Sequence, residues 1–507
     1  MKQFFFSLSI FVILSFSLGT SALFLDNLQA EVLKNDFNIV LITIDALRAD
    51  HLSCYGYHRK TTPHIDEIAE KGIIFKDAIA PSSWTSPSMV SLFTSVYPIS
   101  HGVIHGYTRN KKIYDQEVFS DELTTLAEIL KTHGYTTFGV ASNLHLSKKF
   151  GFARGFDYFK CLPFHPAPLV NKIIYSWKDE IKKSDKFFLW VHYFDPHHFY
   201  HSRTPWIERY TSKELTQKLK LFKKKMYELL DLIPMLKNDP QALSNLIALY
   251  DSEINYVDFY LGELIQKFEL DKNTLIIISS DHGEGFLEHG LLDHGNSLYA
   301  ESINIPLIMK LPQKMSKKVI DQQVSLLDIM PTILTLLGIP YPKKIYGEPL
   351  LTSNGDERNI EERFIFTELG KGNYNMKAIL TKDWKYIYNC KGRLRELYNR
   401  LKNALMTKDW RYIYSYEGKI EELYNRKQDL QEQVNLISKN PSFGKKLKDQ
   451  LNQWIASASR YPAEKIKITP SQELKEKLKA LGYISNEEQR ELRQSPKGCK
   501  SIPYENQ

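Results

Sequence analysis

Short apolar runs rich in β-branched residues recur along the chain and predict buried strands of a single sheet. They span residues 37–44, 136–141, 187–192 and 275–280. Three runs end in polar residues that can carry chemistry: Asp45 after the first, residues 192–195 after the third, and Asp281 with His282 after the last. Ligand sites in open α/β sheets lie at the carboxyl ends of the strands, so these residues are the first candidates for a functional site.

Apolar residues at helical spacing lie between these runs. Residues 123–133 predict one helix, and residues 250–268 predict a longer helix with one apolar face. Ser86 and Pro87 are typical of the N-cap and the first residue of a helix that runs to about Thr94. The alternation of strands and helices predicts a largely parallel sheet that is covered on both faces.

A second part of the chain begins at about Gly338 and contains an internal repeat. Residues 378–400 recur at a constant offset as residues 404–426. Each copy alternates aromatic and polar residues and has a glycine near a turn, which predicts a tandem pair of β-hairpins in a small antiparallel sheet. We therefore expect a first domain over residues 37–340 and a C-terminal subdomain over residues 341–485.

The two chain ends and one charged segment complete the predicted organisation. Residues 1–22 have one Lys and then an apolar run, typical of a cleaved signal peptide or of an uncleaved membrane anchor. Both alternatives predict an exported body, periplasmic or extracellular, that meets a membrane only through an uncleaved N-terminus. Residues 471–483 predict a helix packed on the body, and residues 486–507 predict a loose tail. The Lys-rich residues 211–233 predict a helix that is either a solvated surface or a contact for a membrane or an acidic ligand.

Composition narrows the class of protein. The chain has 507 residues and a formal net charge of +8, which allows anionic substrates. No signature of a nucleic-acid-binding module occurs in it, so nucleic acid is not expected as a partner. The four cysteines have neither the spacing of a metal site nor the density of a disulfide framework.

Three separated segments together predict a divalent metal site: Asp45, Thr85, and Asp281 with His282. Carboxylates and imidazole are ligands that hard or borderline divalent cations prefer. Thr85 precedes the predicted helix, where the helix dipole and a bound metal would both favour an alkoxide nucleophile. Taken singly, each segment also has a structural explanation, with Asp45 and Thr85 as helix caps and the Asp281 segment as a turn.

These residues, in this order, resemble the sulfatase branch of the alkaline phosphatase superfamily. The similar segments are residues 38–57, 83–102, 191–197, 249–262, 279–306 and 410–436. The resemblance implies an α/β sandwich with a mixed, largely parallel central sheet and a smaller C-terminal antiparallel sheet. It also implies hydrolysis of an anionic sulfate or phosphate ester at one divalent metal, Zn, Mn or Ca. The implied metal ligands are Asp45, Thr85, Asp281 and His282.

The chain departs from the family pattern at several positions of the implied site. Ala46 stands where sulfatases have a second aspartate, and Thr85 where they have the Cys or Ser that becomes formylglycine. Met89 replaces the arginine of that motif, and His294 replaces a lysine. A formylglycine hydrate expels sulfate through its second hydroxyl, which threonine lacks. Thr85 as nucleophile therefore favours phosphoester chemistry. The alternatives are a phosphoethanolamine- or phosphoglycerol-type transferase, or a binding protein without turnover.

Two histidines acquire roles from the resemblance. His197 and His294 are expected to bind the transferred anion or to act as general acid. A sharper alternative is a second metal held by Asp195, His197 and His294, as in the two-metal members of the superfamily.

Four further residues are weaker candidates. Asn143 and His145 follow a predicted strand and would line the cleft, with Asn143 as a substrate contact. His289 would hold a loop in place. Arg48 would either contact the anion or form an ion pair on a helix surface.

Overall fold

The computed structural model describes residues 36–105, 107–110, 113–211, 229–270, 272–313, 315–359, 363–371, 374–389, 394–399, 411–415, 420–461 and 463–468. The predicted N-terminal signal or anchor (1–22), the helix at 471–483, the tail at 486–507 and most of the Lys-rich segment at 211–233 lie outside these residues. Among the described helices, none combines the length and the apolar character needed to cross a membrane.

The central sheet has eight strands, and every run that the apolar pattern predicted is one of them. Its strands are β1 (Asn38–Ile44), β2 (Ile73–Ile79), β5 (Thr136–Ala141), β6 (Tyr158–Cys161), β7 (Phe187–Tyr193), β8 (Thr274–Ser280), β11 (Asn304–Lys310) and β12 (Lys318–Ser325). They lie in the order β12-β2-β11-β8-β1-β7-β5-β6. Only β11 runs antiparallel to its two neighbours among these strands. The prediction of a mixed, largely parallel sheet is confirmed.

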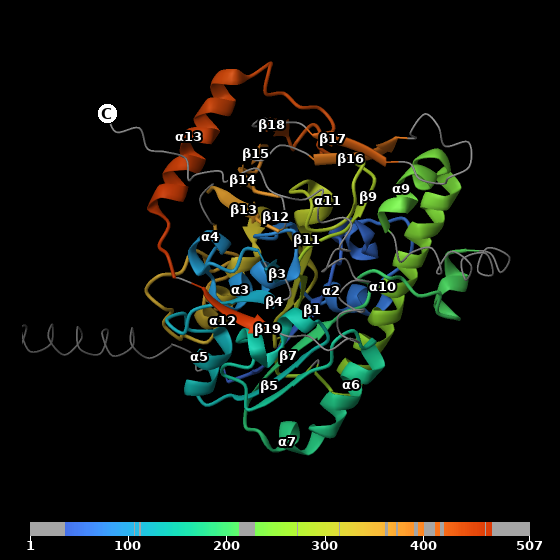
Figure 1. Cartoon of the computed structure of the whole chain (residues 1–507). Helices are drawn as coiled ribbons and strands as arrows, with labels where there is room; N and C mark the ends of the chain where they lie inside the picture. The colour runs from blue at the N-terminus through green and yellow to red at the C-terminus, as the bar shows by residue number, and fades with distance from the viewer. Residues whose placement is uncertain are drawn as a thin grey trace, which may run out of the picture.

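Alternate residues of the central strand β1 enter opposite cores, because successive side chains of a strand point to opposite faces. Ile39 and Leu41 pack into one core and Val40, Ile42 and Ile44 into the other. The first core is covered by α3 (Thr85–Thr94), α5 (Leu126–Thr132) and α12 (Ile329–Leu336), and the second by α2 (Pro63–Ala69), α6 (Ala167–Ser176) and α10 (Pro240–Phe268) (Figure 1). Burial on both faces explains why β1 is a continuous apolar run without polar alternation.

Capping residues set the helix starts, and the predicted starts differ from the observed ones. Helix α10 begins ten residues before the predicted start at residue 250, because the Asp239 side chain accepts hydrogen bonds from the backbone N–H groups of Gln241 and Ala242. Helix α5 begins at Leu126, where Thr125 and Glu128 form a reciprocal capping box. The apolar periodicity therefore located both helices but not their first residues.

The smaller sheet corrects the interpretation of the repeat. Its strands β13 (Ile365–Leu369), β14 (Met376–Leu380), β15 (Trp384–Asn389) and β18 (Ile420–Asn425) are antiparallel neighbours in that order. Strand β15 of the first copy pairs with β18 of the second copy, while β16 (Leu394–Asn399) pairs with β17 (Arg411–Ser415). The first copy thus contains a hairpin of β14 and β15, but the last strand of each copy pairs with a strand of the other copy, which the prediction of one hairpin per copy did not include.

Sequence similarity between the copies permits this exchange. Both copies end in Glu-Leu-Tyr-Asn-Arg, so their final strands share four consecutive residues. In the observed pairing, Arg426, which follows β18, forms an ion pair with Asp77 of β2, at 2.7 Å. This ion pair joins the end of β18 to the central sheet.

The smaller sheet is joined to the loop that precedes α3. The backbone N–H of Glu368 donates to the Pro81 carbonyl (2.9 Å), and the Ser82 hydroxyl donates to the Glu368 carbonyl (2.6 Å). Helix α13 (Pro441–Ser457) packs on β14 and β15. The remaining helices are η1 (Ala49–His51), η2 (Ser53–Tyr55), α4 (Pro98–His101), η3 (Leu144–Leu146), η4 (Lys148–Phe150), α7 (Lys178–Lys183), η5 (Trp206–Arg209), α9 (Leu229–Asn238), α11 (Ala300–Ile303) and η6 (Leu326–Asp328), and the remaining strands are β3 (Tyr107–Asn110), β4 (Ile113–Val118), β9 (Gly285–Phe286), β10 (Leu292–Asp293) and β19 (Glu464–Ile468).

Candidate active site

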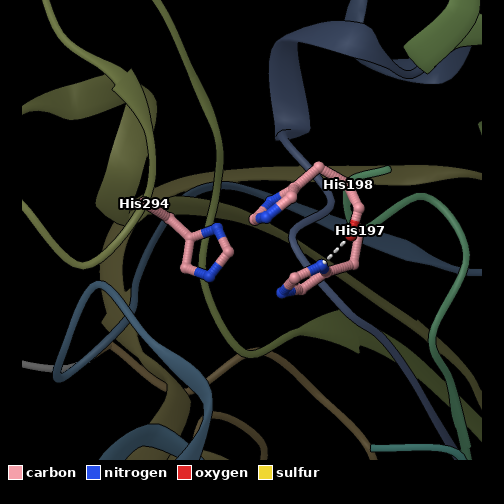
Figure 2. A group of neighbouring side chains, drawn as sticks. All are labelled: His197, His198 and His294. Atoms are coloured by element: carbon pink, nitrogen blue, oxygen red, sulfur yellow. Dashed lines mark hydrogen bonds between the residues drawn. The ribbon is translucent and has the colours of Figure 1, made fainter. Parts of the chain in front are cut away.

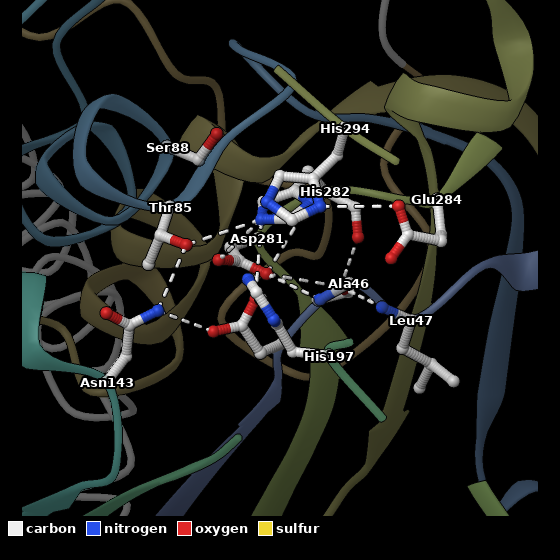
Figure 3. Close-up of polar contacts among 12 residues, drawn as sticks. Ala46, Leu47, Thr85, Ser88, Asn143, His197, Asp281, His282, Glu284 and His294 are labelled. Carbon is white, nitrogen blue, oxygen red and sulfur yellow. Dashed lines mark hydrogen bonds and ion pairs between the residues drawn. The ribbon is translucent and has the colours of Figure 1, made fainter. Parts of the chain in front are cut away.

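The carboxyl ends of β1 and β8 bring the predicted acidic residues together. These strands are parallel neighbours with Ile44 opposite Ser280, so the next residues, Asp45 and Asp281, emerge side by side. His282 Nε2 lies 3.4 Å from Asp45 Oδ1 and 3.4 Å from Asp281 Oδ2. All three side chains are fully buried (Figure 3).

Thr85 completes this group from the first turn of α3. Its hydroxyl lies 3.3 Å from His282 Nε2. The N-cap of α3 is Trp84, in extended conformation, and Thr85 is the first helical residue, so the prediction of Ser86 as N-cap is wrong. The Thr85 hydroxyl does not cap the helix and points toward His282 (Figure 3).

Asn143 bridges the nucleophile candidate and the acidic pair. Its Oδ1 accepts the backbone N–H of His145 (2.9 Å), which fixes the orientation of the amide. Its Nδ2 therefore faces the site and donates to Asp45 Oδ2 (2.7 Å) and to Thr85 Oγ1 (3.3 Å). Asn143, a weak candidate in the sequence, thus touches two central side chains.

The polar atoms of this group fit a divalent cation. Asp45 Oδ1 and Asp281 Oδ2 are buried and have no hydrogen-bond partner among the described residues. His282 Nδ1 lies 2.9 Å from the Gly283 carbonyl, which can only accept, so Nδ1 carries a proton and Nε2 is the ring nitrogen that faces both carboxylates. Metal–ligand bonds of about 2.1 Å place neighbouring ligand atoms about 3.0–3.5 Å apart, which matches these separations.

Electrostatics supports the same assignment. Burial, and next the neighbouring Asp45 carboxylate, raise the pKa of Asp281. Two buried carboxylates side by side are costly unless a cation lies between them. Asp45, Asp281 and His282 are therefore the residues that would hold the metal.

A second cluster, which we call the histidine cluster, contains His197, His198 and His294 (Figure 2). The rings of His197 and His294 lie 4.7 Å apart, and the ring of His294 lies 4.2 Å from that of His282. Asp293 Oδ1 lies 2.8 Å from His294 Nδ1, and Glu284 Oε1 lies 3.3 Å from it. Burial opposes protonation of His294, but Asp293 and then Glu284 raise its pKa to about 10.

Asp195 does not belong to the histidine cluster. Its carboxylate accepts hydrogen bonds from Arg203 (2.6 Å) and from the backbone N–H of Ala167 (2.9 Å). The predicted metal set of Asp195, His197 and His294 is therefore not assembled. The described residues that could hold a second cation at this place are instead His198, Glu284, Asp293 and His294, or the three histidines.

Other candidates have structural partners. Arg48 donates to the Glu284 carbonyl (2.9 Å) and forms ion pairs with Asp50 (2.7 Å) and Glu288, which agrees with the ion-pair alternative. His289 bridges Glu301 (2.8 Å) and the Glu432 carbonyl (2.9 Å), as expected of a residue that holds a loop.

His145 is buried with its ring edge against Trp84, 5.8 Å between centroids. Burial, and then the charge of Lys371, lower the pKa of His145 to about 3, so its imidazole is neutral. His145 thus lies behind the nucleophile candidate as a neutral packing residue.

Sequence reasoning gave no role to two residues beside the site. His192 Nε2 lies 3.3 Å from Asp45 Oδ2, and its Nδ1 lies 2.8 Å from the Thr43 hydroxyl. Its position at the end of the predicted strand 187–192 was the available signal. Lys371, which follows β13 in the C-terminal part, had no signal because it lies far away in the sequence.

Comparison with known proteins decides the family. Residues 37–339 match the family described as Sulfatase, and residues 287–458 match N-sulphoglucosamine sulphohydrolase, C-terminal. The chain belongs to the sulfatase family. It is accordingly a sulfatase-family ester hydrolase, in a family that depends on a metal.

Similar proteins include both sulfatases and a phosphonate hydrolase. The chain is 25% identical over 422 residues to the uncharacterized sulfatase YidJ of Escherichia coli K12, covering 72% of this chain and 80% of that protein. The phosphonate monoester hydrolase of Agrobacterium radiobacter has a TM-score of 0.62 at 19% identity, covering 83% of this chain and 95% of that one. A protein solved with its substrate D-glucosamine-2-N,6-O-disulfate has a TM-score of 0.61 at 18% identity, covering 82% and 97%. At these identities the two structures show the fold.

The structure shows where two residues that depart from the sulfatase motif, Met89 and Ala46, lie. Met89 is fully buried in the core beneath α3, so this position provides no cation to the site. Ala46 is buried too, and its backbone N–H donates to Asp281 Oδ1 (3.2 Å). The acidic group of this chain therefore lacks one carboxylate and one guanidinium of the resembled pattern.

Proposed function

We propose that this sulfatase-family protein is a metal-dependent hydrolase that favours phosphate esters and uses Thr85 as its nucleophile. The observation that carries the proposal is the Thr85 hydroxyl, which lies 3.3 Å from His282 Nε2 beside two carboxylate oxygens without hydrogen-bond partners. Asp45, Asp281 and His282 would hold the metal together with Thr85. A bound divalent cation would supply a lowered hydroxyl pKa and charge neutralisation for the anion.

The protein's own residues then carry out attack on phosphorus, orientation of the nucleophile and protonation of the leaving group. Thr85 Oγ1 attacks phosphorus in line with the bond to the alcohol, that bond breaks, and the alcohol leaves with a proton. Water then attacks phosphorus of the phosphothreonine and the bond to Thr85 Oγ1 breaks, which restores the threonine hydroxyl and releases inorganic phosphate from a monoester substrate or a phosphomonoester from a diester substrate. Asn143 Nδ2, 3.3 Å from Thr85 Oγ1, orients the hydroxyl. His197 and His294 bind the phosphoryl oxygens or protonate the leaving alcohol.

The substrate preference follows from the Thr85 side chain. A sulfate ester on threonine has no second hydroxyl through which to collapse, whereas a phosphate ester on threonine is open to attack by water at phosphorus. A second metal at His198, Glu284, Asp293 and His294 is the alternative to a protonated His294. Residues 1–22 support export to the periplasm or the extracellular space, where the substrate is an anionic ester.

Turnover assays test the proposal. Purified protein is loaded with Zn²⁺, Mn²⁺ or Ca²⁺ and given an aryl phosphodiester, an aryl phosphomonoester and an aryl sulfate. Metal-dependent phosphoester cleavage is expected in the wild type, and Thr85→Ala is expected to lose it by at least about 10³-fold. Thr94→Ala is the matched control, since this threonine lies at the other end of α3 and bonds only to the Val90 carbonyl among the contacts described.

Three outcomes count against the proposal. Sulfate turnover that survives Thr85→Ala would mean that another group is the nucleophile. Metal-dependent transfer to an added alcohol without hydrolysis would favour the transferase. Metal binding without any turnover would favour a binding protein.

A further inference from the structure

We infer that Lys371, from the C-terminal part of the chain, supplies the cation that binds the substrate's tetrahedral oxyanion in place of the arginine of the sulfatase motif. This inference rests on the proposed function, because it assigns a ligand contact to the same site. It adds a specificity residue that lies outside the sulfatase match at residues 37–339.

Lys371 lies between the nucleophile side and the histidine side of the site. Its Nζ is 5.5 Å from the ring centroid of Trp84, the residue before Thr85. On the other side it faces Gly295, the residue after His294, because a Cβ atom at Gly295 would lie 3.1 Å from Nζ. The ammonium group is therefore close to the Trp84 ring, beside Thr85, and to Gly295, beside His294.

The charge of this ammonium group interacts with carboxylates of the site. Burial lowers the pKa of Lys371, while Asp293, then Glu284 and Asp45, act in the opposite direction. The same charge is felt on the Thr85 side, because Lys371 contributes to lowering the pKa of His145. Lys371 thus shares the electrostatic environment of Asp45, Asp281 and His282, which we call the metal group, and of the histidine cluster.

The backbone just before Lys371 is hydrogen-bonded to the loop that precedes α3 and to the residues around α4. The Glu368 carboxylate accepts the backbone N–H of Ile99 (2.8 Å), besides the two backbone contacts of Glu368 with Pro81 and Ser82. The Gly370 carbonyl lies 2.6 Å from His105 Nδ1, and a Cβ atom at Gly370 would lie 2.2 Å from an Ile104 methyl group. These contacts fix the end of strand β13 and Gly370 against the residues around α3 and α4, and so position Lys371, the second residue after the strand.

The site has a reason to need this charge. Met89 occupies the arginine position and is buried in the core, and His294 replaces a lysine. A tetrahedral oxyanion carries charge on several oxygens, and a metal neutralises only those that face it. A second cation that arrives from another element restores the anion-binding power that the motif lost.

Anion binding to the metal-loaded protein tests the role of Lys371 without depending on turnover. Inorganic phosphate and sulfate are titrated calorimetrically into wild type, Lys371→Met, Lys371→Arg and Lys382→Met, each loaded with Zn²⁺ or Mn²⁺. Methionine keeps the length of the lysine stem without its charge. Lys382→Met is the matched control, because this lysine forms an exposed ion pair with Asp321 in the same part of the chain.

We expect Lys371→Met to bind phosphate at least tenfold more weakly than wild type, with unchanged metal affinity and melting temperature. Lys371→Arg should retain more affinity than Lys371→Met, and Lys382→Met should equal wild type. Wild-type phosphate affinity in Lys371→Met would overturn the inference, as would a loss of metal binding in that variant. Failure of the metal-loaded wild type to bind either anion would overturn the proposed function itself and the inference with it.

Discussion

The metal group and the histidine cluster lie side by side at one edge of the central sheet and are built from the same residue types, yet their charges are balanced differently. In the metal group, two aspartates face Nε2 of one imidazole, and two of their carboxylate oxygens have no hydrogen-bond partner among the described residues. In the histidine cluster, Asp293 lies within 3.1 Å of His198 and within 2.8 Å of His294. The metal group needs a bound cation to neutralise its two carboxylates. In the histidine cluster, the protonated imidazolium of His294 is itself the cation.

This difference shows that residue types at a strand end do not distinguish a metal site from an internal ion-pair group. The orientation of each imidazole determines which kind of site the residues form. His282 is turned by its bond to the Gly283 carbonyl so that Nε2 faces the acids, while His294 directs Nδ1 at Asp293 and Glu284. The histidine cluster is thereby suited to an anion and the metal group to a cation.

The largest effect is expected from Asp281→Asn, which removes a charged ligand from the metal group. Metal affinity should fall by at least about 100-fold, and metal-dependent turnover should fall with it. Isothermal titration with Zn²⁺ and Mn²⁺ measures the affinity. Asp50→Asn, which alters only the ion pair with Arg48, is the control. Unchanged metal affinity in Asp281→Asn would remove the distinction between the two clusters.

The next effect is expected from His294→Gln, which removes the imidazole that pairs with Asp293 and Glu284. Because it leaves the metal ligands in place, kcat/KM should fall by roughly 10²-fold while metal affinity stays near that of wild type. Steady-state kinetics and metal titration on the same preparation separate these quantities. His133→Gln, at an exposed helix end, is the control. A parallel loss of metal affinity would show that His294 belongs to a metal site.

A smaller effect is expected from Asp195→Asn, the residue that the structure separates from the histidine cluster. The neutral amide leaves Arg203 with Glu253 as its remaining carboxylate partner. Unfolding in urea should show a loss of about 1–3 kcal/mol in stability. Metal affinity should not change, and a change would return Asp195 to the metal-binding residues.

The smallest effect is expected from deletion of residues 390–415, which removes one repeat and connects β15 to β18 through a short segment. Because β15 already pairs with β18, both clusters and the smaller sheet should form. The free energy of unfolding should change by no more than about 2 kcal/mol, since closing a shorter loop costs less entropy. Circular dichroism, urea unfolding and metal titration would test this, and an insoluble product would show that the β16–β17 pair is required for folding.

The local pattern of apolar and polar residues predicted several strands of the central sheet and two of the residues at the site. The continuous apolar runs located β1, β5, β7 and β8, because strands buried on both faces exclude polar residues. Parallel strands start and end together at the same edge, so the residues after two of these runs, Asp45 and Asp281, could be predicted to meet. The order of the motifs along the chain also indicated the family that the comparison established.

The tertiary structure decided what depends on contacts between distant segments. Whether β15 pairs with β16 or β18 cannot be read from the repeat, since both copies end in Glu-Leu-Tyr-Asn-Arg and both final strands suit an antiparallel partner. Asp195 forms an ion pair with Arg203 and not with the histidine cluster. Lys371 lies beside the site although it comes from the C-terminal part of the chain. Local sequence determines which residues end a strand, but the orientation of a buried polar side chain follows from the partners that the whole fold places around it.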